Sequence, residues 1–301
     1  PVGQGWEKAQ EIIKEKSGGK MAIEIYPDSQ LGDKSSLIDS MLLGENVCTL
    51  ADGAFYADYG VPDFGIVFGP FLFDSWDQVW KLVDSDWYKE QCGKLEEKGL
   101  KIIASNWIYG ERHTLTNVPV NTVDDLKGLK IRVPSNEIQS KGFDVLGATS
   151  TGMALGDVYQ ALQTKTIDGA ENNWPTYQNM GDYEAATFYV LDEHTRVPEI
   201  LLASAEVLSS LDPADVEIIK QCAIETEAYE KAKWAEKEES SEKIVREAGC
   251  TIVELTPEAF AEFQAAMTNP SDALGGQSLY EKYGAKYQDV IDAITKVGEA
   301  Y

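Results

Sequence analysis

Apolar residues recur along the chain with two periods, one typical of helices and the other typical of strands. Spacing on one helical face predicts amphipathic helices over 6–16, 34–43, 75–98, 136–147, 156–164, 213–248, from 256 onward and over 276–299. Two-residue alternation and short apolar runs predict strands over 21–26, 47–50, 101–104, 130–133, 189–194, 199–205 and 251–255. Because strands and helices follow one another in this order, the pattern favours an α/β fold with a parallel sheet covered by helices.

The stretch 128–134 shows the strand pattern most clearly. Apolar Ile131 and Val133 alternate there with basic Lys130 and Arg132. A short strand would hold the Arg132 guanidinium as a rigid fork, which suits a carboxylate. A salt bridge at the surface or between domains is the simpler alternative for a single arginine.

The length of the chain predicts more than one domain. Its 301 residues exceed what one hydrophobic core usually organises, so two domains are expected. Predicted strands continue on both sides of residues 105 and 205, which indicates that the chain crosses between the domains more than once. The helix over 213–248 starts with Pro213 in its first turn and would be about 50 Å long. A helix of that length can lie across both domains.

Polar and aromatic residues gather directly after several predicted strands. One group is a predicted loop over 52–59, a second covers 106–113, and a third is a brief extended piece from 170 that Pro175 stops. Loops after parallel strands are frequent ligand sites, and amides cannot be buried without partners. We therefore expect a polar cavity lined by Asp52, Tyr56, Asn106, Trp107, Asn172, Asn173 and Trp174. Core packing is the alternative for Trp174, and a surface loop is the alternative for Asp52.

The balance of charges narrows the choice of partner. Acidic residues outnumber basic ones by 51 to 26, which gives a net charge of −25. This charge excludes nucleic acid as a partner and argues against docking on an anionic membrane, because both would be repelled. A site for an anion must therefore supply its own positive charge. Arg112, which stands 20 positions before Arg132, is the second basic candidate in polar surroundings. The sequence has no run of 18 apolar residues that could span a membrane.

Signatures of enzyme active sites are missing from the sequence. It contains no GxSxG, GxGxxG, P-loop or HExxH motif, and its only histidines are His113 and His194. Glu171 could serve as a base, but its neighbours offer no nucleophile. We therefore expect a binding protein with no catalytic residue, metal or cofactor, and a structural hydrogen-bonding role for both histidines.

The cysteines give no sign of a metal or redox site. The four of them form no CxxC pair and have no histidine beside them: Cys48, Cys92, Cys222 and Cys250. This arrangement indicates scattered thiols rather than zinc or redox chemistry. One disulfide stays open as an alternative if the protein is exported.

Six short motifs stand in the chain in a characteristic order. They are Ser17-Gly18-Gly19-Lys20, Pro27 with Gln30-Leu31-Gly32, Pro70-Phe71-Leu72-Phe73, the stretch 125–134, Asp157-Val158-Tyr159-Gln160-Ala161-Leu162-Gln163, and Ile167-Asp168-Gly169-Ala170-Glu171-Asn172. With these motifs in register over nearly its whole length, the chain resembles the solute-binding proteins of tripartite ATP-independent periplasmic (TRAP) transporters, of the dicarboxylate-binding DctP type.

The resemblance implies a two-lobed, periplasmic-binding-protein-like fold with a central cleft and a long helix that spans both lobes. The expected lobe I comprises 1–107 and 199–235, and the expected lobe II comprises 108–198 and 236–301. Hinge strands are expected near 105–110 and 195–205, with closure of the lobes over the solute. In the site, the resemblance implies that Arg132 grips a carboxylate of the solute, that Arg112 assists, and that Asn172 takes part.

The nature of the solute follows from the predicted cleft residues. They are too polar for an aliphatic keto acid, and amides are natural partners of hydroxyl groups. Trp107 and Trp174 suit the C–H face of a sugar ring, and the stretch 171–175 resembles members of the family that take hexuronates. We therefore expect D-glucuronate or D-galacturonate, with a C4-dicarboxylate or another sugar acid, such as a sialic acid, as the alternatives.

The resemblance also predicts where such a protein works and what it meets. A periplasmic monomer is expected, exported behind an ordinary or a lipoprotein leader, with a first strand ahead of residue 1. It would hand its solute to TRAP membrane permease subunits.

Overall fold

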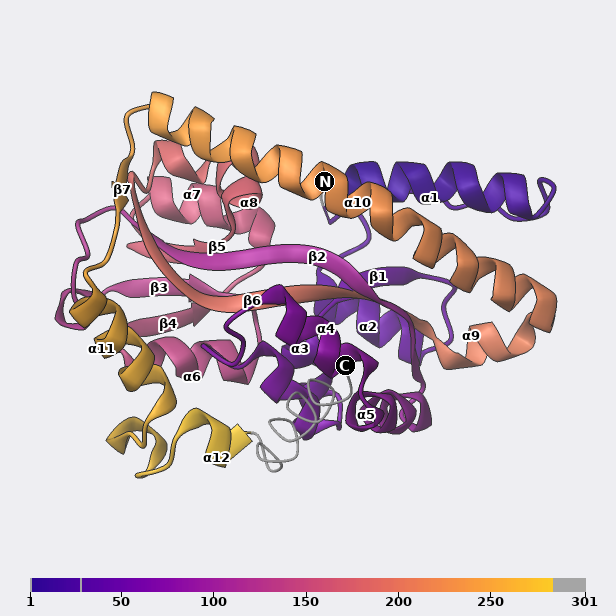
Figure 1. The fold of residues 1–301 in the computed structure, drawn as a ribbon, viewed down its shortest axis with the longest axis horizontal. Coiled ribbons are helices and arrows are strands. Elements are labelled where there is room, and N and C mark those ends of the chain that lie inside the picture. Colours follow the sequence, from indigo (N-terminus) through magenta and orange to yellow (C-terminus); the bar gives the residue numbers. More distant parts are fainter. Residues whose placement is uncertain (1, 28, 284–301) are drawn as a thin grey trace.

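Two long strands carry the fold in the computed structural model, which describes residues 2–27 and 29–283. They are β2 (Leu100–Thr116) and β6 (Phe188–Ser204), each of 17 residues, and they pair antiparallel along the middle of one sheet (Figure 1). The strand order is β1-β6-β2-β5-β3-β4, with β7 also on β6. β1, β5 and β7 pair directly with one end of a long strand, and β3 and β4 continue the sheet beyond β5.

The sheet is mixed rather than parallel, which corrects the prediction from the order of elements. β1 (Cys48–Ala51) pairs antiparallel with β6, and β5 (Gly169–Asn172) pairs antiparallel with β2. Parallel pairing joins β3 (Lys130–Val133) to β4 (Thr149–Gly152) and to β5, and β7 (Thr251–Val253) to β6. β2 leaves one half of the molecule and β6 returns to it, so these two strands must run in opposite directions.

Each long strand was predicted as two separate pieces. The predicted strand over 101–104 and the polar segment over 106–113 both belong to β2, and the strands predicted over 189–194 and 199–205 both belong to β6. The register of β2 against β6 shifts at several points, so the alternation of inward and outward side chains is interrupted. A pattern with such interruptions resembles a loop between strands.

The middle of β2 is its most irregular part. Register shifts fall between Ala104 and Trp107 and between Ile108 and Gly110. Gly110 has a φ of +119°, and a Cβ there would lie 2.8 Å from Cζ2 of Trp234. The close approach of a helix to this point of the strand therefore requires glycine.

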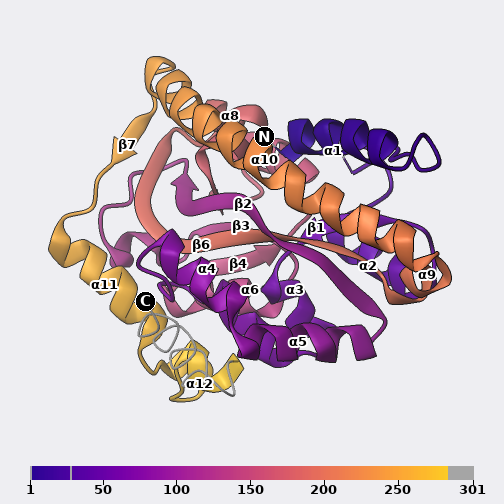
Figure 2. The same ribbon diagram turned by 45° about the vertical axis from the view of Figure 1, so that its right-hand side comes forward.

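The predicted long helix is confirmed as α10 (Pro213–Glu247), which has 35 residues and lies across both halves of the molecule (Figure 1). Asp212 caps its first turn by accepting a hydrogen bond from the Ala214 N–H at 2.9 Å. The helix packs on α1 (Val2–Lys16), on β2 and on α8 (Trp174–Asn179). Figures 1 and 2 both show α1 and α10 on one side of the long strands, with the helices from α3 to α6 on the other.

Separate hydrophobic cores lie at the two ends of the long strands. One core contains Leu100 of β2 and Ile200 of β6. At the other end, Leu115 of β2 and Tyr189 of β6 belong to a second core, and a third contains Ile131 of β3. The same two strands therefore contribute to cores in both halves, while the exact lobe boundaries stay a prediction.

Most predicted helices are confirmed, with small changes in their limits: α1, α2 (Lys34–Leu42), α6 (Glu137–Val145), α7 (Val158–Gln163) and α11 (Pro257–Thr268). The helix predicted over 75–98 is two helices, α4 (Trp76–Asp84) and α5 (Asp86–Glu97). Ser85 separates them, because its hydroxyl donates to the Leu82 carbonyl at 2.6 Å and accepts from the Tyr88 N–H at 3.1 Å.

Three further predictions needed correction. The segment over 52–59 is not a loop but contains α3 (Gly53–Asp58). Residues 21–26 form no strand: Met21 and Ile23 pack against α1 and α10, which explains their alternation without a sheet. Pro175 does not end an extended piece but stands in the first turn of α8, where proline is tolerated.

The remaining elements are short. They are η1 (Pro62–Phe68), η2 (Val123–Leu126), η3 (Leu155–Asp157), η4 (Asp182–Glu184), α9 (Ala205–Ser210), η5 (Asp272–Leu274) and α12 (Leu279–Tyr283). Of the helix predicted over 276–299, the part within α12 is present, and the part beyond 283 lies outside the described residues.

Candidate ligand-binding site

Arg132 is a buried cation held in place by the backbone. It belongs to β3, is only 3% exposed, and its Nε donates a hydrogen bond to the Met153 carbonyl at 2.8 Å. Burial lowers its pKa to about 10, so the guanidinium stays charged at neutral pH. In the described part of the chain, arginine ion pairs are made by Arg112, Arg196 and Arg246 and none by Arg132. Its two terminal nitrogens are therefore available to an anion.

Arg112, the second predicted arginine, already has an internal counter-ion. Its Nε and one terminal nitrogen bind the two carboxylate oxygens of Glu171, the latter at 2.6 Å, and the same nitrogen reaches the Glu171 carbonyl at 3.0 Å. Burial opposes ionisation of Glu171, but the Arg112 charge and hydrogen bonds from His194 and Arg112 lower the pKa of Glu171 to about 2. The pair is therefore ionised and neutral as a unit, and Arg112 adds little free charge to the site.

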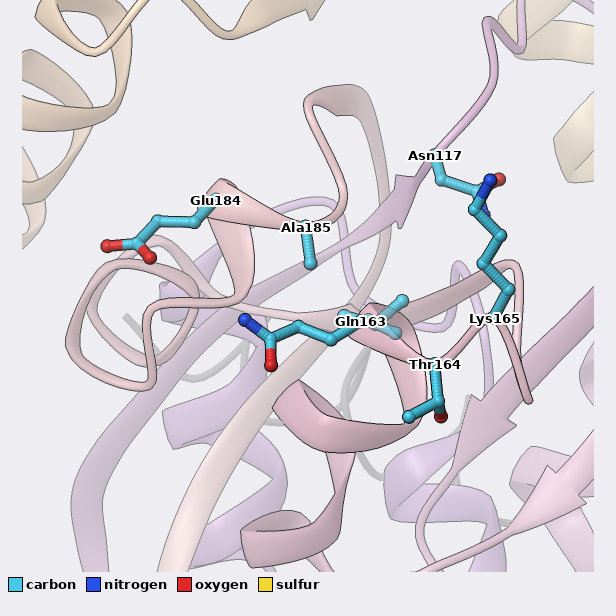
Figure 3. A pocket seen from close by; sticks show the side chains of 7 residues that line it. Asn117, Gln163, Thr164, Lys165, Glu184 and Ala185 are labelled. Atoms are coloured by element: carbon cyan, nitrogen blue, oxygen red, sulfur yellow. The ribbon is translucent and has the colours of Figure 1, made fainter.

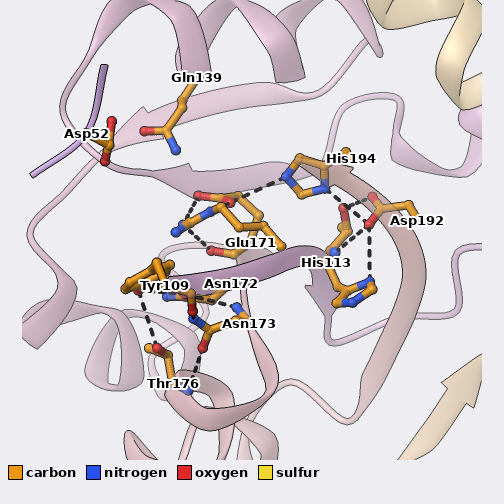
Figure 4. Close-up of polar contacts among 12 residues, drawn as sticks. Asp52, Tyr109, His113, Gln139, Glu171, Asn172, Asn173, Thr176, Asp192 and His194 are labelled. Carbon is orange, nitrogen blue, oxygen red and sulfur yellow. Dashed lines mark hydrogen bonds and ion pairs between the residues drawn. The ribbon is translucent and has the colours of Figure 1, made fainter. Parts of the chain in front are cut away.

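His194 extends this pair into a buried network (Figure 4). Its Nε2 lies 3.4 Å from Oε2 of Glu171, and its Nδ1 lies 3.1 Å from Oδ1 of Asp192. Asp192 in turn accepts hydrogen bonds from the backbone N–H and the hydroxyl of Thr114, at 3.1 and 2.6 Å. Burial opposes protonation of His194, but the two carboxylates raise its pKa to about 9.

His113 lies in the same network, but its ring is neutral. Its Nδ1 accepts a hydrogen bond from the Glu193 N–H at 3.3 Å, which suits a neutral ring. Burial lowers its pKa to about 4 although Asp192 opposes this effect. One histidine of the network is thus charged and the other neutral at physiological pH.

The two predicted amides at the end of β5 differ in how many of their side-chain hydrogen bonds are already made within the protein. Oδ1 of Asn172 accepts hydrogen bonds from the Tyr109 hydroxyl at 2.8 Å and from the Asn173 N–H at 3.0 Å, while its Nδ2 has no partner among the described residues. Asn173 instead caps α8, accepting from the Thr176 N–H at 2.8 Å and donating to the Tyr109 carbonyl. Asn172 therefore has donors for a ligand, whereas Asn173 is used by the fold.

A second polar group of the candidate site, here called the opposite wall, contains a lysine that two carboxylates share. Nζ of Lys34, the first residue of α2, lies 3.4 Å from Oε1 of Glu199 and 4.0 Å from Oδ2 of Asp52. Asp52 also caps α3, through a 3.0 Å hydrogen bond from the Ala54 N–H. Oε2 of Glu199 is buried and has no hydrogen-bond partner in the described structure. Burial raises the pKa of both Asp52 and Glu199, although Lys34 opposes the shift.

Tyr109 of β2 joins the two walls. The Lys34 Nζ lies 5.5 Å from the centre of its ring and the Arg112 guanidinium carbon 5.1 Å from it, while its hydroxyl binds Asn172. Lys34, Tyr109 and Glu199 were not predicted from the sequence. For Glu199 a signal was present, because it is a lone acid in the apolar run 197–203.

Two predicted site residues lie against helix α10 instead. Nδ2 of Asn106 donates to the Glu227 carboxylate. Trp107 is 1% exposed, and its ring centre lies 5.6 Å from that of Trp6. Both side chains thus fix the long helix and α1 to β2, and we do not place them in the site.

Two further predicted aromatics are packed in hydrophobic cores. Tyr56 is completely buried among apolar residues, with its hydroxyl 3.4 Å from the Ile200 carbonyl. The Trp174 ring centre lies 4.1 Å from that of Tyr189, in the core beside β5. The alternative of core packing therefore holds for Trp174, and neither ring faces the polar walls.

Neither of two hollows in the described structure is lined by Arg132. An open pocket lies at the ends of β2 and α7, lined by Asn117, Leu162, Gln163, Thr164, Lys165, Glu184 and Ala185 (Figure 3). It contains none of the predicted residues and one cation, Lys165. A second hollow, of about 20 Å³ between Gln139, Glu171 and His194, is too small for an organic acid.

Other classes of site find no support in the described structure. No group of His, Cys, Asp and Glu among residues 2–27 and 29–283 is arranged to hold a metal ion. The four cysteines, all of which are described, are free. None of the described helices is both long and apolar enough to cross a bilayer.

Comparison with known proteins agrees with this architecture. Residues 1–274 match the family model DctP, described as "Bacterial extracellular solute-binding protein, family 7". The chain therefore belongs to the DctP family, the solute-binding proteins of TRAP transporters. Members of this family are substrate-binding proteins of transporters and not enzymes, and they act in the periplasm.

Three similar proteins illustrate the family. The C4-dicarboxylate-binding periplasmic protein DctP of Rhodobacter capsulatus is 28% identical over 297 residues, which cover 98% of this chain and 87% of that protein. A TRAP periplasmic solute-binding protein of Xanthobacter autotrophicus, solved with β-D-galacturonate, has a TM-score of 0.88 and 30% identity and covers 100% of this chain and 96% of its own. One of Roseobacter denitrificans, solved with β-D-glucuronate, has a TM-score of 0.88 and 28% identity, with coverages of 99% and 94%.

We predict that the charge on His194 makes folding stability fall in mildly alkaline solution. Its pKa is about 9 in the folded protein and about 6.5 in an unfolded chain. Its stabilising charge is therefore fully present below the lower value and is lost as the pH rises through the higher one. This difference corresponds to a loss on the order of 3 kcal/mol in the free energy of unfolding.

Urea unfolding at about pH 7 and about pH 9.5 measures this loss. His194→Gln, which carries no charge at either pH, should show little pH dependence in this range. The assignment is wrong if that variant loses as much stability as the wild type.

Proposed function

We propose that this protein captures a sugar acid with a single carboxylate, first of all D-glucuronate or D-galacturonate, and delivers it to a TRAP membrane permease. The observation that carries the proposal is the state of Arg132, a buried guanidinium with an anchored Nε and no ion pair within the described residues. Burying an uncompensated charge is costly, so such a group favours a ligand that brings the opposite charge. The bound hexuronates of the two similar solved structures support the same reading.

The charges around Arg132 favour one carboxylate over two. Glu171 neutralises Arg112, so Arg132 is the cation left for the ligand. On the opposite wall, Asp52 and Glu199 share the single charge of Lys34. A second carboxylate at that wall would meet two acids and would be repelled.

The same wall suits hydroxyl groups. The unpartnered Oε2 of Glu199 can accept a hydrogen bond from a hydroxyl, and Nδ2 of Asn172 can donate one. A polyhydroxylated acid satisfies both, whereas succinate can accept from Asn172 but has no hydroxyl to donate to Glu199. The dicarboxylate thus becomes the weaker alternative, and another sugar acid, such as a sialic acid, remains the stronger one. The proposal also includes action as a monomer and delivery to the permease, and both are taken from the role of the family.

We predict that Arg132→Lys weakens binding of glucuronate or galacturonate nearly as much as Arg132→Ala. Lysine keeps the charge but loses the planar fork and the hydrogen bond that Nε makes to Met153. The loss should be roughly 2–5 kcal/mol by isothermal calorimetry. Arg246→Lys is the matched control, since Arg246 lies on the exposed side of α10 and pairs with Glu242. A dissociation constant for Arg132→Lys within about threefold of the wild type would refute a bidentate contact between Arg132 and the ligand carboxylate.

We predict that the site ranks its ligands in the order uronate, succinate, glucose. Glucose brings no charge to Arg132, and succinate brings a second carboxylate to the wall of Asp52 and Glu199. Titration of glucuronate, galacturonate, succinate and glucose into one ligand-free preparation measures the order. Glu199→Gln should reduce the difference in affinity between uronate and succinate, because it removes one repelling charge and keeps the size of the side chain.

Each deviation from this order has its own meaning. Succinate binding more tightly than both uronates would rule out the sugar-acid assignment and leave the family unaffected. Glucose binding as tightly as glucuronate would rule out the role of Arg132. An unchanged difference in affinity between uronate and succinate in Glu199→Gln would show that Glu199 does not set the preference for uronate.

We predict that the two lobes, 1–107 with 199–235 and 108–198 with 236–301, close over the ligand. The register shifts in β2 between Ala104 and Gly110 lie where the hinge is expected, because a bulged ladder bends more easily than a regular one. Small-angle X-ray scattering should show a smaller radius of gyration with saturating glucuronate and no change with glucose. Superimposable curves with and without saturating glucuronate would argue against closure.

A further inference from the structure

Tyr109 stands at an irregular point of β2. Ile108 before it pairs with Pro198 of β6, and Gly110 after it pairs with Val197, the residue next to Pro198. Tyr109 is therefore an extra residue of the strand, without a partner of its own in β6. A bulge of this kind redirects the side chain that it carries. Because the ladder does not fix the backbone of an extra residue, other groups must hold it in place.

Trp234 of α10 holds this point of the strand. Its indole Nε1 donates a hydrogen bond to the Tyr109 carbonyl at 3.0 Å, and the side chain of Asn173 donates to the same carbonyl. The indole also lies so close to Gly110 that a Cβ there would stand 2.8 Å from Cζ2 of Trp234. The ring of Trp76 from α4 packs edge-on against the indole, with 6.3 Å between the ring centres. Trp234 is therefore fixed by packing and directs its one donor at the bulge.

The Tyr109 side chain carries this constraint to the amide of Asn172. Its hydroxyl donates to Oδ1 of Asn172 at 2.8 Å and lies 3.3 Å from the Thr176 hydroxyl (Figure 4). Oδ1 of Asn172 also accepts from the Asn173 N–H at 3.0 Å. Because an amide group is planar, two donors on Oδ1 also set the direction of Nδ2, the donor available to a ligand.

We propose that Trp234 is a positioning residue for ligand binding: by holding the Tyr109 carbonyl it fixes the Tyr109 side chain, which in turn orients Asn172 toward a hydroxyl group of the sugar acid. The inference rests on the proposed function, since it takes Asn172 as a ligand contact. A donor that is already held in its bound orientation loses less conformational freedom on binding, so its hydrogen bond contributes more to affinity. The alternative is that Trp234 only fastens α10 to β2.

Replacement of the indole by a phenyl ring tests the first step. Trp234→Phe keeps an aromatic ring beside Gly110 and removes the N–H group that donates to the Tyr109 carbonyl. We expect glucuronate or galacturonate to bind about threefold to tenfold more weakly by calorimetry, which is the range for the loss of one neutral hydrogen bond. An affinity equal to that of the wild type would overturn the inference.

Trp6→Phe is the matched control. Trp6 is also half-buried, and its ring packs on Trp107 of the same strand, with 5.6 Å between the ring centres. In the described structure, the side chains that donate to the Tyr109 carbonyl are those of Trp234 and Asn173 and not that of Trp6. The affinity of Trp6→Phe should therefore stay at the wild-type value. An equal loss in both variants would overturn the specific role of Trp234.

The Tyr109→Phe background separates positioning from a merely structural role. Tyr109→Phe keeps the ring and removes the hydroxyl that holds Asn172, so the path from Trp234 to Asn172 is already interrupted. In this background, Trp234→Phe should weaken binding by no more than about twofold, because the two changes then act on one interaction. A loss as large as in the wild-type background would show that Trp234 only fastens α10 to β2, and it would overturn the inference.

A nuclear magnetic resonance measurement tests the same chain of contacts without a ligand. The side-chain amide resonance of Asn172, identified by its absence in Asn172→Asp, should move in Trp234→Phe and in Tyr109→Phe. It should not move further when Trp234→Phe is added to Tyr109→Phe, whereas a direct effect of the indole ring would persist. A resonance that stays in place in Trp234→Phe would overturn the inference whatever the ligand. The expected pattern in a protein that binds neither uronate would confirm the positioning of Asn172 and refute the proposed function instead.

Discussion

The buried pair of Arg112 and Glu171 is the interaction on which the site depends. It ties the neighbouring strands β2 and β5 together inside the sheet, and it leaves Arg112 with no free positive charge for a ligand. A buried ion pair of this kind is stable only when further hydrogen bonds complete it, and His194, Asp192 and the Glu171 carbonyl supply them. With Arg112 neutralised, Arg132 keeps the charge that a ligand can use.

The two walls divide recognition between charge and hydrogen bonding. The wall made by β3 and β5 carries Arg132 and Asn172, and the wall made by α2, α3 and β6 carries Lys34, Asp52 and Glu199. In a protein with a net charge of −25, an anion gains nothing from the general surface. Selectivity must therefore come from the few buried cations and from how many acids already surround each of them.

Where a residue of the candidate site has a local signal, the element that holds it could be predicted from the sequence. Arg132 could be found because alternation and Pro134 mark a short strand, and the long helix could be found because Pro213 marks its start. Asn173 looked like a ligand contact, but a helix cap uses the same residue type. The contact between Lys34 and Glu199 spans 165 positions, and the register shifts of β2 hid a strand inside a polar segment. Such features depend on tertiary contacts that no local pattern records.

The continuity of β2 and β6 has a mechanical consequence. Because the two strands stay hydrogen bonded to each other along most of their length, the halves of the molecule are joined by a twisted ribbon and not by a free swivel. A ribbon flexes readily across its flat face and resists shear within its plane. Any movement between the halves would therefore be confined to a narrow set of directions.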